Sequence, residues 1–246
     1  MVIWIDVGTH KAQEYKSVLG SNRWFIIRLI RHAFSSLVLR RGSFAGFTNY
    51  FSLIKTRNSL RSFRSQFRVA FIEANCQLLK DGSYSNVDDV FCLALSGGFN
   101  SSFGLTKLYH ANDDQESQGN SIYKTKSNIS LNQFTLCPKV SADTFASHYK
   151  VFLDSMYEDY QIVLRINCEG SEDDVIYAFS NHFGNKFKLI LGSLKDVEGV
   201  KGEFAHQKML EHIKSNGLLS LDWSSRVDTW LDAQNMLLNT VKAQQC

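Results

Sequence analysis

The first fourteen residues of the chain constrain its fold more than any other stretch. Residues 2–5 are all apolar, which is typical of a strand buried on both faces. Asp6 and Gly8 follow, and helix-forming residues begin at Lys11. Gly8 lets the backbone turn sharply, so that amide groups at the start of the helix can face a ligand. Strand, tight turn and helix form the unit with which a parallel α/β sheet holds a nucleotide-like ligand.

The length and composition of the chain predict one globular domain. Its 246 residues suffice for a full core, and the apolar fraction of 44% and the charged fraction of 21% are ordinary for a soluble protein. With one proline and no evident linker or repeat, we expect a single domain over residues 1–246. The sequence shows no secretory signal and no run of about eighteen uncharged apolar residues. We therefore expect a cytoplasmic protein, with peripheral binding at a membrane surface as an alternative.

The cysteines and histidines give no sign of a metal site. The cysteines are Cys76, Cys92, Cys137, Cys168 and Cys246, without a Cys-x-x-Cys pair. An odd number of unclustered cysteines predicts reduced thiols in the cytosol, and neither a zinc site nor a disulfide framework. His206 and His212 would not share a face of the helix predicted around them. We therefore predict that the chain binds no metal.

Residues 21–66 form the most unusual segment of the chain. Its basic residues are Arg23, Arg28, Arg31, Arg40, Arg41, Lys55, Arg57, Arg61 and Arg64, and no acidic residue lies between Glu14 and Glu73. Apolar and aromatic residues are interleaved with these cations, which predicts one or two amphipathic helices separated near residues 42–46. The apolar face could pack on the sheet and leave the arginines in solvent. Alternatively, residues 23–64 could bind an anionic membrane surface or a polyanion such as nucleic acid or an acidic glycan.

Strands and helices alternate again after this segment. Apolar runs predict strands at residues 67–73, 90–96, 103–110, 160–168, 187–191 and 218–223. Helices are predicted at residues 169–179, 203–215 and 227–243. Residues 111–133 are rich in Asn, Asp, Gln, Ser and Lys, and we expect a mobile surface loop there, near the functional site. This order of elements indicates an α/β fold with a parallel sheet.

Four segments, taken in this order, resemble a known family. They are residues 5–12 (IDVGTHKA), 71–73 (FIE), 93–96 (LALS) and 164–172 (LRINCEGSE). Together they resemble the FkbM family of S-adenosylmethionine-dependent methyltransferases, over about residues 2–180 without the basic segment. The resemblance implies a class I methyltransferase-like, Rossmann-like fold: a seven-stranded, mainly parallel sheet with helices on both faces. Residues 21–66 would then be a basic helical insertion after the first strand–helix unit.

The resemblance also implies a cofactor and the residues that bind it. The cofactor is S-adenosyl-L-methionine, with Asp6, Gly8, Thr9, His10, Glu73, Asn75, Leu95 and Ser96 as the implied binding residues. Asp6 and Gly8 would lie against the methionine part of the cofactor. Glu73 would accept hydrogen bonds from the ribose hydroxyls, and Leu95 and Ser96 would meet the adenine edge.

The candidates for catalysis are Glu169, His10 and Asn167. Glu169 and Glu172 match the late motif of the family, and Glu169 is the predicted general base because a positioned carboxylate can take the proton of an acceptor hydroxyl. His10, which stands where the family has Asn, is the second candidate. Asn167 stands where the family has Asp, so an anion beside the transferred methyl group is missing. Arg165 replaces the family's Lys.

The predicted function is methyl transfer to the hydroxyl of a sugar, a glycan or another small molecule, which makes a small-molecule or glycan acceptor the expected partner. A nucleic-acid methyltransferase that uses the basic segment as its footprint is a less favoured alternative. The third possibility is a non-catalytic protein of the same fold, in which Asn167 marks lost activity.

Overall fold

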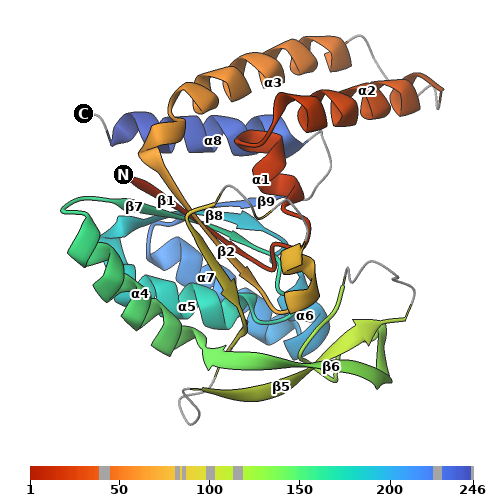
Figure 1. Ribbon diagram of the computed structural model, residues 1–246, viewed down its shortest axis with the longest axis vertical. Helices are drawn as coiled ribbons and strands as arrows, with labels where there is room; N and C mark the ends of the chain where they lie inside the picture. The colour runs from red at the N-terminus through yellow and green to blue at the C-terminus, as the bar shows by residue number, and fades with distance from the viewer. Residues whose placement is uncertain are drawn as a thin grey trace. The chain divides into compact units, whose positions relative to one another are not determined.

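The computed structural model describes residues 1–38, 45–80, 84, 87–97, 103–112, 119–223 and 229–244, and they form two compact units. The first unit comprises residues 1–11 and 68–222, and the second comprises residues 12–67 and 223–246. Figure 1 shows the elements of both. The predicted insertion, residues 21–66, falls inside the second unit, which also takes in helices α1 (Gln13–Val18) and α8 (Trp230–Ala243).

The first unit contains a six-stranded parallel sheet with the strand order β3-β2-β1-β7-β8-β9. The strands are β1 (Val2–Val7), β2 (Phe67–Glu73), β3 (Asp89–Cys92), β7 (Gln161–Ile166), β8 (Phe187–Gly192) and β9 (Leu219–Asp222). The α/β class and the parallel sheet are thus confirmed, but the expected seven strands are wrong for the described residues. The next element after β9 among the described residues is helix α8.

The strand order places the end of β1 at a turning point of the sheet. From β1 the chain moves outwards to β2 and β3, and it then returns to the other side of β1 with β7. β1 and β7 pair in parallel, with Asp6 opposite Arg165 and Val7 opposite Ile166. In open α/β sheets the crevice at such a switch in strand order is where ligands bind. The carboxyl ends of β1, β2 and β7 are therefore the place to look for a site.

Three further strands form a second, smaller sheet with the order β4-β6-β5. They are β4 (Ala94–Ser96), β5 (Phe103–Ala111) and β6 (Ile129–Ser141). The run at residues 90–96, which predicted one strand, is divided at Leu93 between β3 and β4, so its halves belong to different sheets. The sequence reasoning did not find β6, whose side chains are mostly exposed or only partly buried and whose first residues fall in the expected loop.

The helices of the first unit are α4 (Ala142–Met156), α5 (Glu172–Phe183), α6 (Asp196–Lys201) and α7 (Glu203–Ser215), with short 3₁₀ turns η2 (Cys76–Lys80) and η4 (Gly184–Lys186). Helices α4, α5 and α7 lie along one face of the parallel sheet (Figure 1). Their buried residues, such as Tyr149, Phe179 and Met209, share one core with Ile3 and Ile5 of β1. Helix α4 was also missed from the sequence.

The second unit is helical and contains α1, α2 (Asn22–Val38), α3 (Ala45–Ser62), the 3₁₀ turn η1 (Arg64–Gln66) and α8. One or two amphipathic helices were predicted in the basic segment, and the structure has two, α2 and α3. Arg57 of α3 corrects the expectation that the arginines face outwards, because its side chain is 1% exposed. It donates to the carbonyl oxygens of Ser17 and Gly20, at 3.1 and 2.5 Å, and so satisfies the end of α1. Burial lowers its pKa to about 10.

Arg40 and Arg41 lie outside the described residues. None of the helices among the described residues has both the length and the apolar character that crossing a bilayer requires.

Candidate active site at the carboxyl edge of the sheet

The turn after β1 presses against both neighbouring strands. The N–H of Gly8 donates to the carbonyl oxygen of Ile72 in β2 at 2.9 Å, and the N–H of Asn167 donates to the carbonyl oxygen of Val7 at the same distance. Gly8 has a φ of +72°, and a Cβ at this position would lie 1.9 Å from the carbonyl oxygen of Asn167. Glycine is therefore required here by the chain's own packing, both for the backbone angle and for the close approach of β7.

Glu73, at the end of β2, is tied to this turn through backbone amides. Its Oε2 accepts from the N–H of His10 at 2.7 Å and its Oε1 accepts from the N–H of Asn75 at 2.8 Å. His10 has a left-handed φ of 50°, and its carbonyl oxygen accepts from the hydroxyl of Tyr84. Burial raises the pKa of Glu73 above its usual range, and the two amide N–H groups oppose that shift. The predicted cofactor residues Gly8, His10, Glu73 and Asn75 are thus brought together.

Asp6 has a different partner from the expected one. Its side chain is fully buried, and its Oδ1 accepts from Nη1 of Arg165 in β7 at 3.0 Å. The same nitrogen donates to the carbonyl oxygen of Gly8 at 2.7 Å. The hydroxyl of Thr9 donates to the backbone oxygen of Asp6 at 2.7 Å, which closes the turn. Asp6 was expected to lie against the methionine part of the cofactor, but its carboxylate is paired with a cation of the chain itself, and Arg165 links β1 to β7.

Glu169, the predicted base, follows β7 and lies in a left-handed backbone conformation, with a φ of 59°. Its carboxylate forms an ion pair with the ammonium group of Lys126, and its carbonyl oxygen accepts from the hydroxyl of Ser121 at 2.7 Å. Burial raises the pKa of Glu169, whereas the charges of Lys126 and Arg165 oppose the shift. Lys126 comes from the segment that was expected to be a mobile loop. No sequence signal distinguished it from Lys124, the other lysine of that segment.

Glu172 organises the turn that carries Glu169. Its side chain has no exposed surface, and its two carboxylate oxygens accept from the N–H groups of Cys168 at 2.9 Å and Gly170 at 2.8 Å. Burial raises the pKa of Glu172 to about 7. Glu172 therefore shapes the Cys168–Glu172 turn, and Glu169 is the glutamate of this motif that is paired with the side chain of Lys126.

A cluster of charged and hydroxyl groups adjoins this turn. Lys201 donates to Asp173 at 2.6 Å and to Asp174 at 2.7 Å, and the hydroxyl of Tyr123 donates to Asp174 at 3.1 Å. The hydroxyl of Ser171 donates to that of Tyr123 at 3.4 Å. These bonds fix the described part of residues 119–128 against the start of α5.

Leu95 and Ser96 lie in β4 and are both buried. Ser96 lines a pocket of about 140 Å³ together with Gly97 and residues of α4 and α5, including Asp143 and Asp174. The hydroxyl of Ser96 has no hydrogen-bond partner among the described residues. The assignment of Leu95 and Ser96 to the adenine edge stays a prediction.

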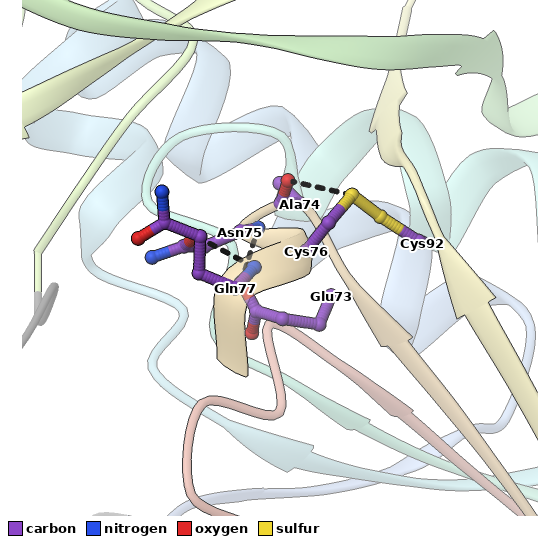
Figure 2. The surroundings of a disulfide bond; sticks show 6 residues. All are labelled: Glu73, Ala74, Asn75, Cys76, Gln77 and Cys92. Atoms are coloured by element: carbon purple, nitrogen blue, oxygen red, sulfur yellow. Dashed lines mark hydrogen bonds between the residues drawn. A yellow bond between two sulfur atoms is a disulfide. The ribbon is translucent and has the colours of Figure 1, made fainter. Parts of the chain in front are cut away.

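A disulfide joins Cys76 to Cys92 directly beside Glu73 (Figure 2). Cys76 lies in η2, two residues after Ala74, and Cys92 is paired in register with Glu73 at the end of β3. The Cα atoms are 5.4 Å apart, within the usual range for such bonds. The prediction that the cysteines form no disulfide is therefore wrong for this pair. The spacing of 16 residues in the sequence gave no sign of it, because it is the pairing of β2 with β3 that brings the two sulfurs together.

Within the described ranges, no cluster of three or more His, Cys, Asp or Glu residues is arranged to hold a metal ion. A scan against protein-family models found no match to this chain, and searches of curated proteins and of solved structures found none either. The geometry of the sheet edge therefore carries the functional argument alone. It offers a glycine turn, a buried carboxylate held by that turn, and a second carboxylate that is paired with a lysine.

Proposed function

We propose that this chain is an S-adenosylmethionine-dependent methyltransferase that methylates a hydroxyl group of a sugar, a glycan or another small molecule. The observation that carries the proposal is the hydrogen bond from the N–H of His10 to Glu73, 2.7 Å long, at the switch point of a parallel sheet. It joins a glycine turn after the first strand to an acid at the end of the second strand, which is the arrangement that grips a ribose in Rossmann-like sites.

The residues around Glu73 fit the ribose part of the cofactor. A carboxylate has about four lone-pair sites, and Glu73 uses one on the N–H of His10 and one on the N–H of Asn75. Two lone-pair sites are therefore left to accept hydrogen bonds from the two vicinal hydroxyls of a ribose. The 8% exposure of Glu73 means that hydrogen bonds formed there are well shielded from water. Asp6 fits less well than expected, because its carboxylate is committed to Arg165. We therefore assign to it the role of fixing the turn.

The bound cofactor would supply a methyl group on a positively charged sulfur. The chain's own residues would have two tasks: to hold the acceptor hydroxyl in line, where orientation contributes roughly 7–11 kcal/mol in favourable cases, and to remove its proton. Glu169 is the base that we propose, since it lies in the turn after β7, next to the end of β1. Lys126 would hold the carboxylate of Glu169 in one orientation and keep it ionised.

One pair of observations favours a second function, a non-catalytic binding protein of the same fold. Asn167 has no charge at a position where the family that the chain resembles has an acid, and the carboxylate of Glu169 is already neutralised by Lys126. Such a protein would use the same sheet edge for a ligand but would leave its hydroxyl groups unmodified.

Calorimetry with S-adenosylmethionine and the full chain tests the proposal. We expect binding to the parent chain, and we expect Glu73→Ala to weaken it by about 1.5–3 kcal/mol for each charge-assisted hydrogen bond lost. Glu158→Ala is the matched control, because Glu158 is an exposed acid before β7, at the opposite end of that strand. A parent chain that does not bind S-adenosylmethionine overturns the function, whereas equal affinity in Glu73→Ala overturns the site.

A further inference from the structure

Six exposed residues of α2 form a stripe along the helix. They are Arg23, Ile26, Ile27, Ile30, Arg31 and Phe34, and we refer to them as the outer stripe. Ile26, Ile30 and Phe34 are four residues apart and lie above one another on the helix surface, and Ile27 and Arg31 widen this row. Ile30 is 62% exposed and Phe34 is 68% exposed. The outer stripe thus has an apolar centre with an arginine on each side of Ile26, Ile27 and Ile30.

The opposite face of α2 is firmly packed within the second unit. Phe25 and Leu29 are buried, and the ring of Phe25 stacks on that of Trp230 in α8, with the centroids 5.7 Å apart. The guanidinium of Arg57 also lies over the ring of Phe25, 4.3 Å from its centroid. The exposure of the outer stripe is therefore not caused by loose packing of α2. The helix already has a core-facing side, and the outer stripe is a second apolar side.

The charged side chains of α2 and α3 are all positive. No acidic residue occurs between Glu14 and Glu73. Within the described part of the second unit, Arg57 is buried and Arg28 donates to Gln13, whereas Arg23 and Arg31 have no carboxylate partner. The neighbouring helix α3, which bonds to α2 through His32 and Tyr50 at 2.6 Å, adds the exposed side chains Phe51, Ile54 and Lys55. Figure 1 shows α2 and α3 running beside each other.

We propose that the outer stripe of α2 binds the surface of an anionic lipid bilayer. A helix with an apolar face flanked by arginines lies in the interface between headgroups and acyl chains, where the apolar residues enter the acyl boundary and the cations meet lipid phosphates. The 17 residues of α2 are enough for a helix that lies in this interface. The inference is independent of methyl transfer.

The chemistry of the outer stripe favours lipid over nucleic acid. Nucleic-acid surfaces place cations where the phosphates run and aromatic rings where bases can stack. The centre of the outer stripe is instead formed by the aliphatic side chains of Ile26, Ile27 and Ile30, which cannot stack on bases and would lose no hydrogen bonds in an acyl environment. A lipid interface offers phosphate groups for the arginines and acyl chains for the aliphatic side chains.

Co-sedimentation of the full chain with vesicles tests the inference. We expect binding to vesicles of phosphatidylcholine mixed with phosphatidylglycerol at low salt, weaker binding as salt rises, and little binding to phosphatidylcholine alone. Ile30→Glu with Phe34→Glu should reduce binding at least about tenfold, because two acids replace the most exposed apolar residues of the outer stripe. Arg23→Gln with Arg31→Gln should also reduce it about tenfold. Circular dichroism of each variant should match that of the parent, because the substituted positions are exposed.

The control variants change similar side chains elsewhere. Phe204→Glu in α7 removes a phenylalanine that is 83% exposed, and Lys208→Gln removes an exposed cation of the same helix; both should leave vesicle binding unchanged. Three results would overturn the inference. These are no binding at low salt, equal binding to neutral vesicles, and retention on heparin or RNA that depends on Arg23 and Arg31 but not on Ile30 and Phe34. Loss of a dimer in Ile30→Glu with Phe34→Glu, without vesicle binding, would assign the outer stripe to a second copy of this chain.

Discussion

The two sides of the sheet edge hold their carboxylates in different ways. On the β1–β2 side, Glu73 is fixed by the backbone N–H groups of His10 and Asn75, and the disulfide of Cys76 lies next to it. On the β7 side, Glu169 is fixed by a side chain, Lys126, that comes from the segment between β5 and β6. Burial raises the pKa of both Glu73 and Glu169. One carboxylate is thus part of the backbone framework, whereas the other depends on one lysine.

Under the proposed function, the two carboxylates would have different tasks, Glu73 in binding and Glu169 in chemistry. A carboxylate held by amides that cannot rotate away is suited to a permanent hydrogen-bonding role towards a ligand. A carboxylate held by one lysine side chain can still accept a proton, which is what the proposed base must do. Arg165 lies between the two, because it bonds to Asp6 and Gly8, and its charge opposes the rise in pKa of both Glu73 and Glu169.

The largest expected effect is therefore that of Arg165→Met, which breaks the link between the two sides. The substitution leaves the carboxylate of Asp6 buried without its cation, and the removal of one partner of a buried ion pair typically costs about 3–5 kcal/mol. We expect the free energy of unfolding in urea to fall by about that amount at neutral pH. The carbonyl oxygen of Gly8 also loses a donor.

The double variant Asp6→Asn with Arg165→Met is the control for Arg165→Met. It removes the buried charge together with its partner, so it should recover part of the lost stability. If Arg165→Met alone unfolds at the same urea concentration as the parent, Arg165 does not hold the β1–β2 side and the β7 side together.

The second effect concerns the disulfide on the β1–β2 side. Cys76→Ala with Cys92→Ala opens a loop of 16 residues, and the loss of a cross-link over such a loop costs roughly 3 kcal/mol. We expect a lower urea midpoint for the double variant and for the parent treated with a reductant. The bonds of Glu73 to His10 and Asn75 do not involve the sulfurs, so S-adenosylmethionine affinity should change much less than stability does.

Cys137→Ala gives the matched control, since Cys137 is a buried free cysteine of β6 outside this turn. This variant keeps the cross-link, so its urea midpoint should still fall when reductant is added, as that of the parent does. If reduction abolishes S-adenosylmethionine binding while the protein stays folded, the disulfide supports the Glu73 site directly. The backbone hydrogen bonds to Glu73 would then not be enough to hold the site.

The sequence predicted the β1–β2 side much better than the β7 side, for a physical reason. The turn at Gly8 and the acid at Glu73 are specified by short apolar runs and by a glycine whose backbone angle no other residue adopts easily. Lys126 acts through a distant segment with no periodicity. The pairing of Asp6 with Arg165 and of Cys76 with Cys92 depends on which strands are neighbours, and that order cannot be read from spacing along the chain.

Two elements, β6 and α4, were not predicted from the sequence, for different reasons. β6 has mostly exposed or half-exposed side chains, so it lacks the continuous apolar run that predicted the strands of the parallel sheet. Helix α4, in contrast, did carry a local signal. Its N-cap, Ser141, accepts from the N–H of Thr144 at 3.0 Å, and a serine before a periodic apolar segment is a standard helix start.

The smallest effect is a change in pKa on the β7 side. Lys126→Met removes the ammonium group that opposes the rise in the pKa of Glu169, so this pKa should rise further above its usual range. Since water still reaches both side chains, we expect this further rise to be modest. Carbon-detected NMR of the Glu169 carboxyl group measures the pKa directly, and Glu169→Gln identifies its signal.

The same substitution has a consequence for stability whose sign follows from linkage. Burial holds the folded-state pKa of Glu169 above its unfolded value, so this group favours the folded state at acid pH and that contribution is lost as pH rises through the folded pKa. Lys126→Met should therefore match the parent near pH 4 and become less stable than it towards pH 7, by about 1 kcal/mol, the upper end for ion pairs that water reaches. Lys186→Met, which breaks the exposed pair with Asp154, should not change the pKa of Glu169. An unchanged Glu169 titration in Lys126→Met would mean that the two carboxylates are held alike, and Lys126 would have no part in setting up a base.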